Sequence, residues 1–104
     1  MPKLSVAERD AFLQERGHLA RIATLQEDGS PSVVPVWFVH EDGKIIITPR
    51  KHSAFWANIQ QDARVAITID EESGVYRKVL VEGKAEVLYP LGHDDEWRDI
   101  YRRI

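Results

Sequence analysis

The run "HLARIATLQEDGSPSVVPVWFVHEDGKIIIT", residues 18–48, decides the fold. It contains two Asp-Gly pairs, Asp28-Gly29 and Asp42-Gly43, and each pair stands between segments rich in β-branched and aromatic residues. Such a pair is the strongest short-range signal for a β-hairpin, because glycine accepts a positive φ without steric cost. The run therefore predicts a meander of three antiparallel strands, over residues 18–25, 31–40 and 44–48.

Pro35 falls inside the second of these strands. Proline has no N–H to donate to a ladder, so it marks an edge strand or a bulge. Val34 and Val36 fit an ordinary buried strand, whereas the large ring of Trp37 beside an interrupted edge suggests the wall of a flat apolar pocket. Backbone groups left unpaired near Pro35 can hydrogen-bond a planar heterocycle. Both interpretations of this strand stay open at this point.

Helical signals flank the meander. Ser5 and Glu8 form a capping box that predicts a helix over residues 4–17, and Ser53 is a plausible N-cap for a helix over residues 53–62. Further strands are predicted at 63–70 and 75–89. Apolar residues at helical spacing predict a third helix, through Trp97, Ile100, Tyr101 and Ile104. The pattern indicates a mainly β protein with peripheral helices, built as a small barrel.

Length and composition narrow the class of protein. A chain of 104 residues suits one domain, and its formal net charge of −3 argues against binding to nucleic acid. The chain has no cysteine, which excludes disulfides and thiolate chemistry. No apolar run is long enough for a signal peptide or a membrane span. These features predict a cytoplasmic protein that binds neither nucleic acid nor membrane.

The bend between the third strand and the second helix carries unexplained charge. In "ITPRKHS", Arg50, Lys51 and His52 stand between Thr48 and the cap residue Ser53. First-turn amides, the positive end of a helix dipole and fixed cations together favour a phosphate group. An exposed loop kept soluble by its charges explains the same residues. Lys78, at the start of the last predicted strand, is likewise either a second cation for an anionic ligand or an exposed strand end.

No catalytic or metal-binding motif stands out. The four histidines lack the spacing of metal ligands, and the acidic run at 92–97 is explained by the start of the third predicted helix. There is no nucleophile elbow and no supported Ser-His-Asp arrangement. The sequence therefore predicts no metal site and names no catalytic side chain.

Taken together, the order of these segments resembles a known family. The pieces "ATLQEDGSPSVVPVWF", "DGKIIIT", "SAFWANIQQDARVA" and "VEGKAEV" are similar to the FMN-binding split-barrel family, the pyridoxamine 5'-phosphate oxidase-like group that includes relatives dependent on the deazaflavin coenzyme F420. The resemblance covers about residues 5–104. It implies a six-stranded split β-barrel in one domain, 1–104, that lacks the family's late strand.

The resemblance also implies a site for FMN, or alternatively F420, at the interface of a homodimer. The second strand would line the flavin ring, through Val33, Val34, Pro35, Val36 and Trp37. The phosphate would be held after the third strand, by Ile47, Thr48, Arg50, Lys51 and Ser53. Lys78 would reach in from the partner subunit. Phe55 and Ala57 stand where many members carry basic residues, so Arg50 and Lys51 would supply the positive charge instead.

Two functions follow from the resemblance. The first is a flavin- or deazaflavin-dependent oxidoreductase that acts on a small molecule by hydride transfer. The alternative is a carrier that binds flavin or haem on the same barrel without turnover, since no catalytic side chain is evident.

Overall fold

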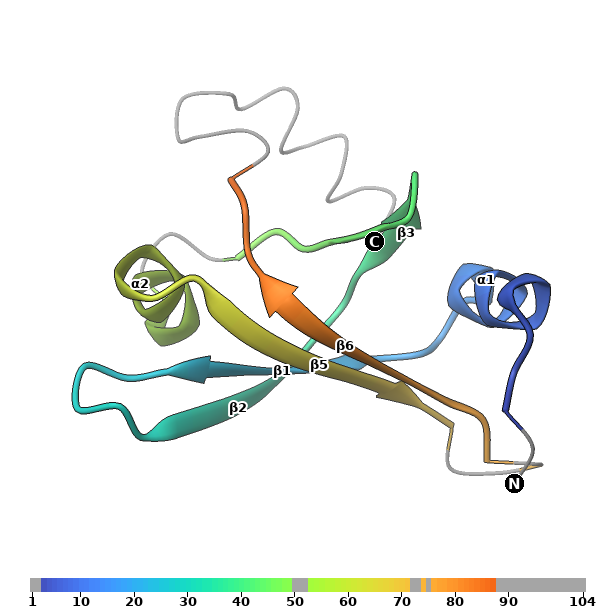
Figure 1. The fold of residues 1–104 in the computed structure, drawn as a ribbon, viewed down its shortest axis with the longest axis horizontal. Helices are drawn as coiled ribbons and strands as arrows, with labels where there is room; N and C mark the ends of the chain where they lie inside the picture. The colour runs from blue at the N-terminus through green and yellow to red at the C-terminus, as the bar shows by residue number, and fades with distance from the viewer. Residues whose placement is uncertain (1–2, 50–52, 72–73, 75, 88–104) are drawn as a thin grey trace.

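The structure is a computed structural model that describes residues 3–49, 53–71, 74 and 76–87. Within these ranges the chain forms two helices and six strands (Figure 1). In chain order they are α1 (Val6–Gln14), β1 (Ala20–Leu25), β2 (Pro31–Val36), β3 (Val39–Glu41), β4 (Lys44–Ile46), α2 (Ala54–Gln61), β5 (Arg64–Asp70) and β6 (Lys78–Lys84). The predicted mainly β class with peripheral helices is confirmed.

Both predicted Asp-Gly turns are present. Asp42 and Gly43 have φ angles of 54° and 72°, which is the left-handed pair that a two-residue type I′ hairpin requires between β3 and β4. In the β1–β2 turn Gly29 has a φ of 85°. There Oδ1 of Asp28 accepts hydrogen bonds from the backbone N–H and the hydroxyl of Ser30, at 3.0 and 2.6 Å. Local turn chemistry thus fixes both hairpins.

Four strands form one antiparallel sheet in the order β2-β1-β5-β6, and β3 pairs with β4 in a separate two-stranded sheet. Residues opposite one another in the register make rows across the larger sheet. One such row contains Val36, Ala20, Ile69 and Val79. Since side chains alternate between faces along each strand, this row points to the core and the neighbouring rows point away from it.

The prediction of one second strand over residues 31–40 is wrong. The strand ends at Val36, and a new strand begins at Val39. β2 pairs with β1 and β3 pairs with β4, so the predicted three-stranded meander is in fact two hairpins in two sheets. The chain bends at Trp37 and Phe38 because it changes sheets there, as strands do at the corners of packed sheets. Among the described residues β2 is an edge strand, which is one of the two alternatives, edge or bulge, that Pro35 predicted.

The remaining predicted elements are present but shorter. The strand predicted at 44–48 ends at Ile46, and the strand predicted at 75–89 covers Lys78–Lys84. Residues 85–87 are described and lie outside any strand. The third predicted helix lies outside the described residues.

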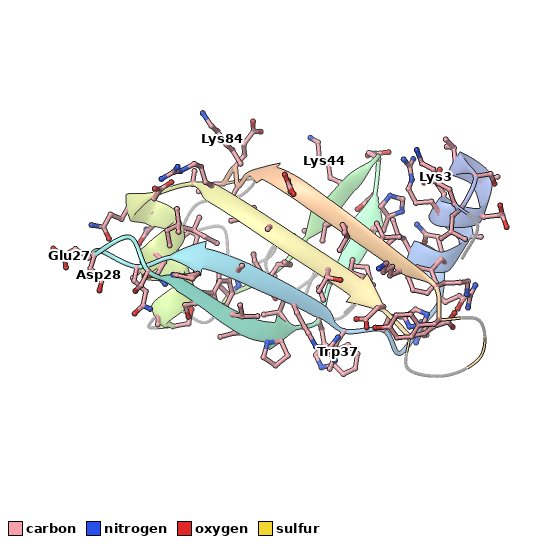
Figure 2. All side chains as sticks on the ribbon, turned by 60° about the horizontal axis from the view of Figure 1, so that its bottom comes forward. Lys3, Glu27, Asp28, Trp37, Lys44 and Lys84 are labelled. Carbon is pink, nitrogen blue, oxygen red and sulfur yellow. The ribbon has the colours of Figure 1, made fainter. Side chains whose placement is uncertain are left out.

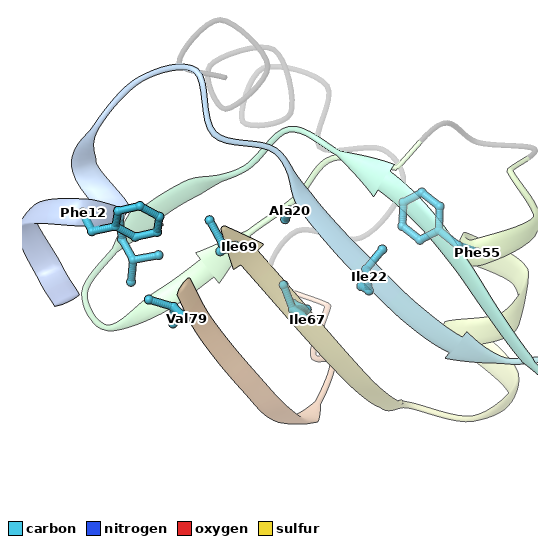
Figure 3. Close-up of a cluster of buried hydrophobic side chains, with 8 residues drawn as sticks. Phe12, Ala20, Ile22, Phe55, Ile67, Ile69 and Val79 are labelled. Atoms are coloured by element: carbon cyan, nitrogen blue, oxygen red, sulfur yellow. The ribbon is translucent and has the colours of Figure 1, made fainter. Parts of the chain in front are cut away.

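The core lies between the inner face of the large sheet and the elements packed against it (Figure 3). Phe12 of α1 and Ile69 of β5 are fully buried. The buried hydrophobic residues are Phe12, Leu13, Ala20, Ile22, Phe55, Ile67, Ile69 and Val79. They come from both helices and from three strands of the sheet, so each helix is held by the same apolar cluster.

Specific polar contacts fix the two helices. In α1 the capping box is complete, because Ser5 N donates to Glu8 Oε1 at 2.9 Å and Glu8 N donates to Ser5 Oγ at 3.1 Å. In α2 the side-chain amide of Asn58 donates to the hydroxyl of Thr24 at 3.1 Å. Thr24 is buried in β1, so this bond satisfies a polar group that burial would otherwise leave without a partner.

Candidate functional site

The outer face of the large sheet, opposite the core, carries exposed apolar side chains. Val33 is 62% exposed, Trp37 51% and Leu80 68%. No described helix or strand lies in front of the four strands in Figure 2, where Trp37 projects beside the end of β2. Large apolar side chains exposed on one face of a sheet favour a binding or association site there. We call this surface the outer face.

The register defines the outer face in rows. The row nearest its centre contains Pro35, Arg21, Thr68 and Leu80. The next row contains Val33, Ala23, Ala66 and Glu82. In the second row the inner strands carry only the small residues Ala23 and Ala66, whereas the inner strands of the first row carry Arg21 and Thr68.

The predicted ring-lining residues of β2 divide between the two faces. Val33 and Pro35 are exposed on the outer face, together with Trp37 just beyond the strand. Val34 and Val36 pack against the core, so only their backbone groups are available to a ligand. Within the described part of the chain β2 pairs with β1 only, which leaves backbone groups along its other edge open there. An apolar stripe beside open backbone groups fits a flat heteroaromatic ring.

The β3–β4 hairpin brings the predicted phosphate segment back toward the end of β2. The β3–β4 ladder ends at the pair Val39 and Ile46. Ile47 and Thr48 follow β4, and Phe38 and Trp37 precede β3, so the two segments leave the hairpin at the same end. The side chain of Ile47 packs against the core, and Thr48 is half-buried. Thr48 therefore has the better-placed side chain of the two for a polar ligand.

Ser53 caps α2 as predicted. Its hydroxyl accepts a hydrogen bond from Trp56 N at 3.4 Å. The first amides of a helix have no intrahelical partner, so they remain a suitable anion site. Phe55 is buried in the core and Ala57 is exposed. The predicted phosphate ligands Arg50 and Lys51 lie outside the described residues.

Lys78 is the first residue of β6, which forms the edge of the sheet opposite to β2. It is exposed and makes no ion pair with the residues that the structure describes. Three strand spacings of about 4.8 Å separate the two edges, roughly 14 Å in all. Within one subunit the structure therefore does not bring Lys78 to the ring-lining residues.

The outer face holds an ion pair that sequence reasoning missed. Arg21 Nη1 lies 2.7 Å from Asp70 Oδ1, and the two side chains are 40% and 18% exposed. The hydroxyl of Tyr76 also reaches Asp70, at 3.4 Å. Tyr76 adopts a φ of 56°, an uncommon conformation for a bulky residue. Arg21 alternates with apolar residues along its predicted strand. This alternation was the sequence signal that could have placed Arg21 on the outer face.

The largest displacements of pKa belong to ion pairs away from this surface. Arg77 donates to Glu71 at 2.7 Å and to Glu15 at 2.9 Å. Hydrogen bonds from Arg77 lower the pKa of Glu71 to about 2. The guanidinium also stacks over the ring of Phe12, at 4.9 Å from its centroid. This network links α1 to the β5–β6 connection, and its role is structural.

An apolar groove of about 750 Å³ opens on the core side of the large sheet. Its walls come from β4, α2, β5 and β6, and they include Ile45, Ile59 and Val81. None of the exposed ring-lining residues of β2 contributes to it. Leu80 and Glu82 of the outer face also line the groove, so the two features meet along the β6 edge of the sheet.

Two kinds of site are absent from the described residues. No group of three or more His, Asp or Glu side chains is placed there to hold a metal ion. No helix in the described ranges is long and apolar enough to cross a membrane.

Comparison with solved structures gives three similar folds. The first is conserved hypothetical protein Rv2991 from Mycobacterium tuberculosis, with a TM-score of 0.74 and 28% identity, over 85% of this chain and 56% of that protein. This chain therefore spans little more than half the length of that protein. The second is an F420 reductase, with a TM-score of 0.69 and 25% identity, over 98% of this chain and 79% of the reductase.

The third is a FAD-binding protein, mll6688, from Mesorhizobium loti. Its TM-score is 0.69 and its identity 24%, over 96% of this chain and 72% of that protein, a likeness that speaks for the fold alone. No curated protein matches the chain.

The family model described as pyridoxamine 5'-phosphate oxidase matches residues 6–104, which is nearly the whole chain. With the antiparallel sheets and the similar solved folds, this match confirms the predicted split barrel. The chain belongs to the pyridoxamine 5'-phosphate oxidase family of flavin-binding proteins.

Proposed function

We propose that this protein is a cytoplasmic, homodimeric oxidoreductase that uses FMN, or alternatively F420, to act on a small molecule. One observation carries the proposal. The edge strand β2 presents Val33, Pro35 and Trp37 as an exposed apolar stripe beside open backbone groups. Membership of a flavin-binding family and likeness to an F420 reductase support a tricyclic ring as the ligand of that stripe.

Different residues of the chain would bind different parts of the cofactor. Val33, Pro35 and Trp37 would pack against the ring and exclude water from one side of it. Thr48, Ser53 and the first amides of α2, with Arg50 and Lys51, would hold the phosphate. The bound cofactor supplies hydride transfer at its ring, while the protein supplies position and electrostatics.

The position of Lys78 argues for a dimer in which two outer faces meet. A two-fold axis that runs parallel to the strands places β6 of one subunit over β2 of the other. Asp70 pairs with Lys78 at the same end of the sheet where β2 leads into Trp37. Lys78 of the partner subunit would then stand over Trp37, which removes the separation that exists within one subunit. The same packing would bury Val33 and Leu80.

Titration of the purified protein with FMN tests the proposal. We expect a visible flavin band that co-elutes with the protein and a melting temperature that rises with FMN concentration. If neither FMN nor F420 gives a co-eluting absorbance band or a rise in melting temperature, cofactor binding is contradicted. Binding without turnover of reduced nicotinamide or a panel of electron acceptors would favour the alternative, a flavin or haem carrier.

A further inference from the structure

We infer that Arg21, held in place by Asp70, makes the site bind the reduced cofactor more tightly than the oxidised one. This inference rests on the proposed function and goes beyond it, because it assigns to Arg21 the control of redox preference. No role in cofactor binding was predicted for this residue from the sequence.

The position of Arg21 is the first argument. Arg21 is the direct cross-strand partner of Pro35, in the middle of the ring-lining stretch of β2. Such partners have their Cβ atoms about 4.5–5.5 Å apart. Arg21 and Pro35 both lie on the outer face, because Ala20 and Ile22 on either side of Arg21 are buried in the core. A ring packed on β2 therefore has Arg21 as its neighbour on the next strand.

The surroundings of Arg21 are the second argument. The residues next to it in its row, Pro35 and Thr68, are uncharged, and the adjacent row on the inner strands holds only Ala23 and Ala66. When the surface is covered, a cation in such a setting loses hydration. This loss costs free energy unless the cation forms ion pairs or hydrogen bonds with the groups that cover it. Asp70 offsets part of this cost, yet it engages Arg21 through Nη1 alone among the bonds of the described residues.

The chemistry of the ring is the third argument. Reduction adds electron density to a flavin-type ring, and positive charge near the ring nitrogens tunes its electronics. A guanidinium that keeps donors in reserve can hydrogen-bond a ring oxygen or nitrogen that becomes more negative. Asp70 fixes the guanidinium in place, so Asp70 is a positioning residue and Arg21 is the group that meets the cofactor.

The test compares FMN affinity in the two redox states. The Kd of oxidised FMN is measured by fluorescence quenching. The Kd of reduced FMN is measured in a separate titration without oxygen, in which dithionite keeps FMN reduced. The variants are Arg21→Gln, Arg21→Lys and Asp70→Asn. Arg64→Gln is the matched control, because Arg64, at the start of β5, also lies on the outer face but pairs with Asp62 at the far end of the sheet. Light scattering checks that each variant keeps the subunit number of the wild type.

We expect Arg21→Gln to weaken binding of reduced FMN about tenfold, the effect of losing one hydrogen bond to a charged group, while affinity for oxidised FMN changes less than threefold. Arg21→Lys should retain most of the preference, Asp70→Asn should reduce it, and Arg64→Gln should leave it intact. Equal losses for both redox states in Arg21→Gln would overturn the inference while leaving the proposed function in place. A wild-type protein that binds FMN in neither state would overturn both.

Discussion

Nε of Arg77 lies 2.7 Å from Oε2 of Glu71 across the β5–β6 connection, and the same guanidinium reaches Glu15, the C-cap residue of α1. Arg77 thereby joins two parts of the chain that are 62 residues apart in sequence. The neighbouring residue, Lys78, begins β6 and would reach the cofactor site of the partner subunit in the proposed dimer. The Arg77 network thus anchors the strand end from which Lys78 would act.

The first prediction concerns the pH dependence of this network. Hydrogen bonds from Arg77 lower the pKa of Glu71 to about 2 in the folded state, below the value of about 4.3 in an unfolded chain. Ionised Glu71 therefore stabilises the fold fully above about pH 4.3, and the contribution is lost as the pH falls toward 2. We expect Glu71→Gln to lower the melting temperature at pH 7 and to converge on the wild type near pH 2.

Thermal unfolding followed by circular dichroism from pH 2 to pH 7 measures this difference. Glu27→Gln is the control, because Glu27 lies in the exposed β1–β2 turn and should leave the melting temperature unchanged. A Glu71→Gln deficit that stays constant over the whole pH range would show that packing, not charge, accounts for the effect.

The second prediction concerns the subunit interface. Val33→Glu places a charge on the outer face and should convert the proposed dimer to a folded monomer, because burying an unpaired carboxylate is costly. Val6→Glu is a matched control, since Val6 in α1 is 65% exposed and Val33 62%. Light scattering gives the mass and circular dichroism the strand content. A Val33→Glu protein that remains a dimer would exclude the outer face as the interface.

The third prediction tests the orientation of the two subunits. The chain has no cysteine, so Trp37→Cys with Lys78→Cys introduces the only thiols. Within one subunit three strand spacings separate these positions by roughly 14 Å, whereas sheets stacked face to face lie about 10 Å apart. With the axis parallel to the strands, a bis-maleimide linker about 10 Å long should give covalent dimers on a denaturing gel. Trp37→Cys with Lys84→Cys, at the other end of β6, should stay monomeric on the gel; the reverse result would demand another axis.

The fourth prediction concerns the basic bend. Replacing Arg50 and Lys51 together with Ala should raise the Kd for FMN at least tenfold, since in the proposed site each cation would contribute a charge-assisted bond to phosphate. The change should be much smaller for riboflavin, which has no phosphate. Lys3→Ala with Arg9→Ala removes the same charge from the exposed N-terminal part of the chain and serves as the control. Unchanged FMN affinity in the Arg50 and Lys51 variant would make the bend an ordinary solvated loop.

Much of the fold could be predicted because its signals are local. The φ angles of Asp42 and Gly43, the capping box of Ser5 and Glu8, and the cap at Ser53 each depend on a few neighbouring residues. The extent of the second strand could not be predicted in this way. The residues around Trp37 have strand propensity, but the break depends on which sheet each half joins, and that is a long-range choice.

The sequence by itself determined the turns, the caps, the edge character that Pro35 gives to β2, and the residue types available for a flavin-type ligand. Only the tertiary structure decided which of these residues share a surface. It turned Val33, Pro35 and Trp37 outward and Val34 and Val36 into the core, because packing chooses the face of a strand. It also set Arg21 beside Pro35 and Lys78 at the far edge, because strand order and register place residues that are distant in sequence.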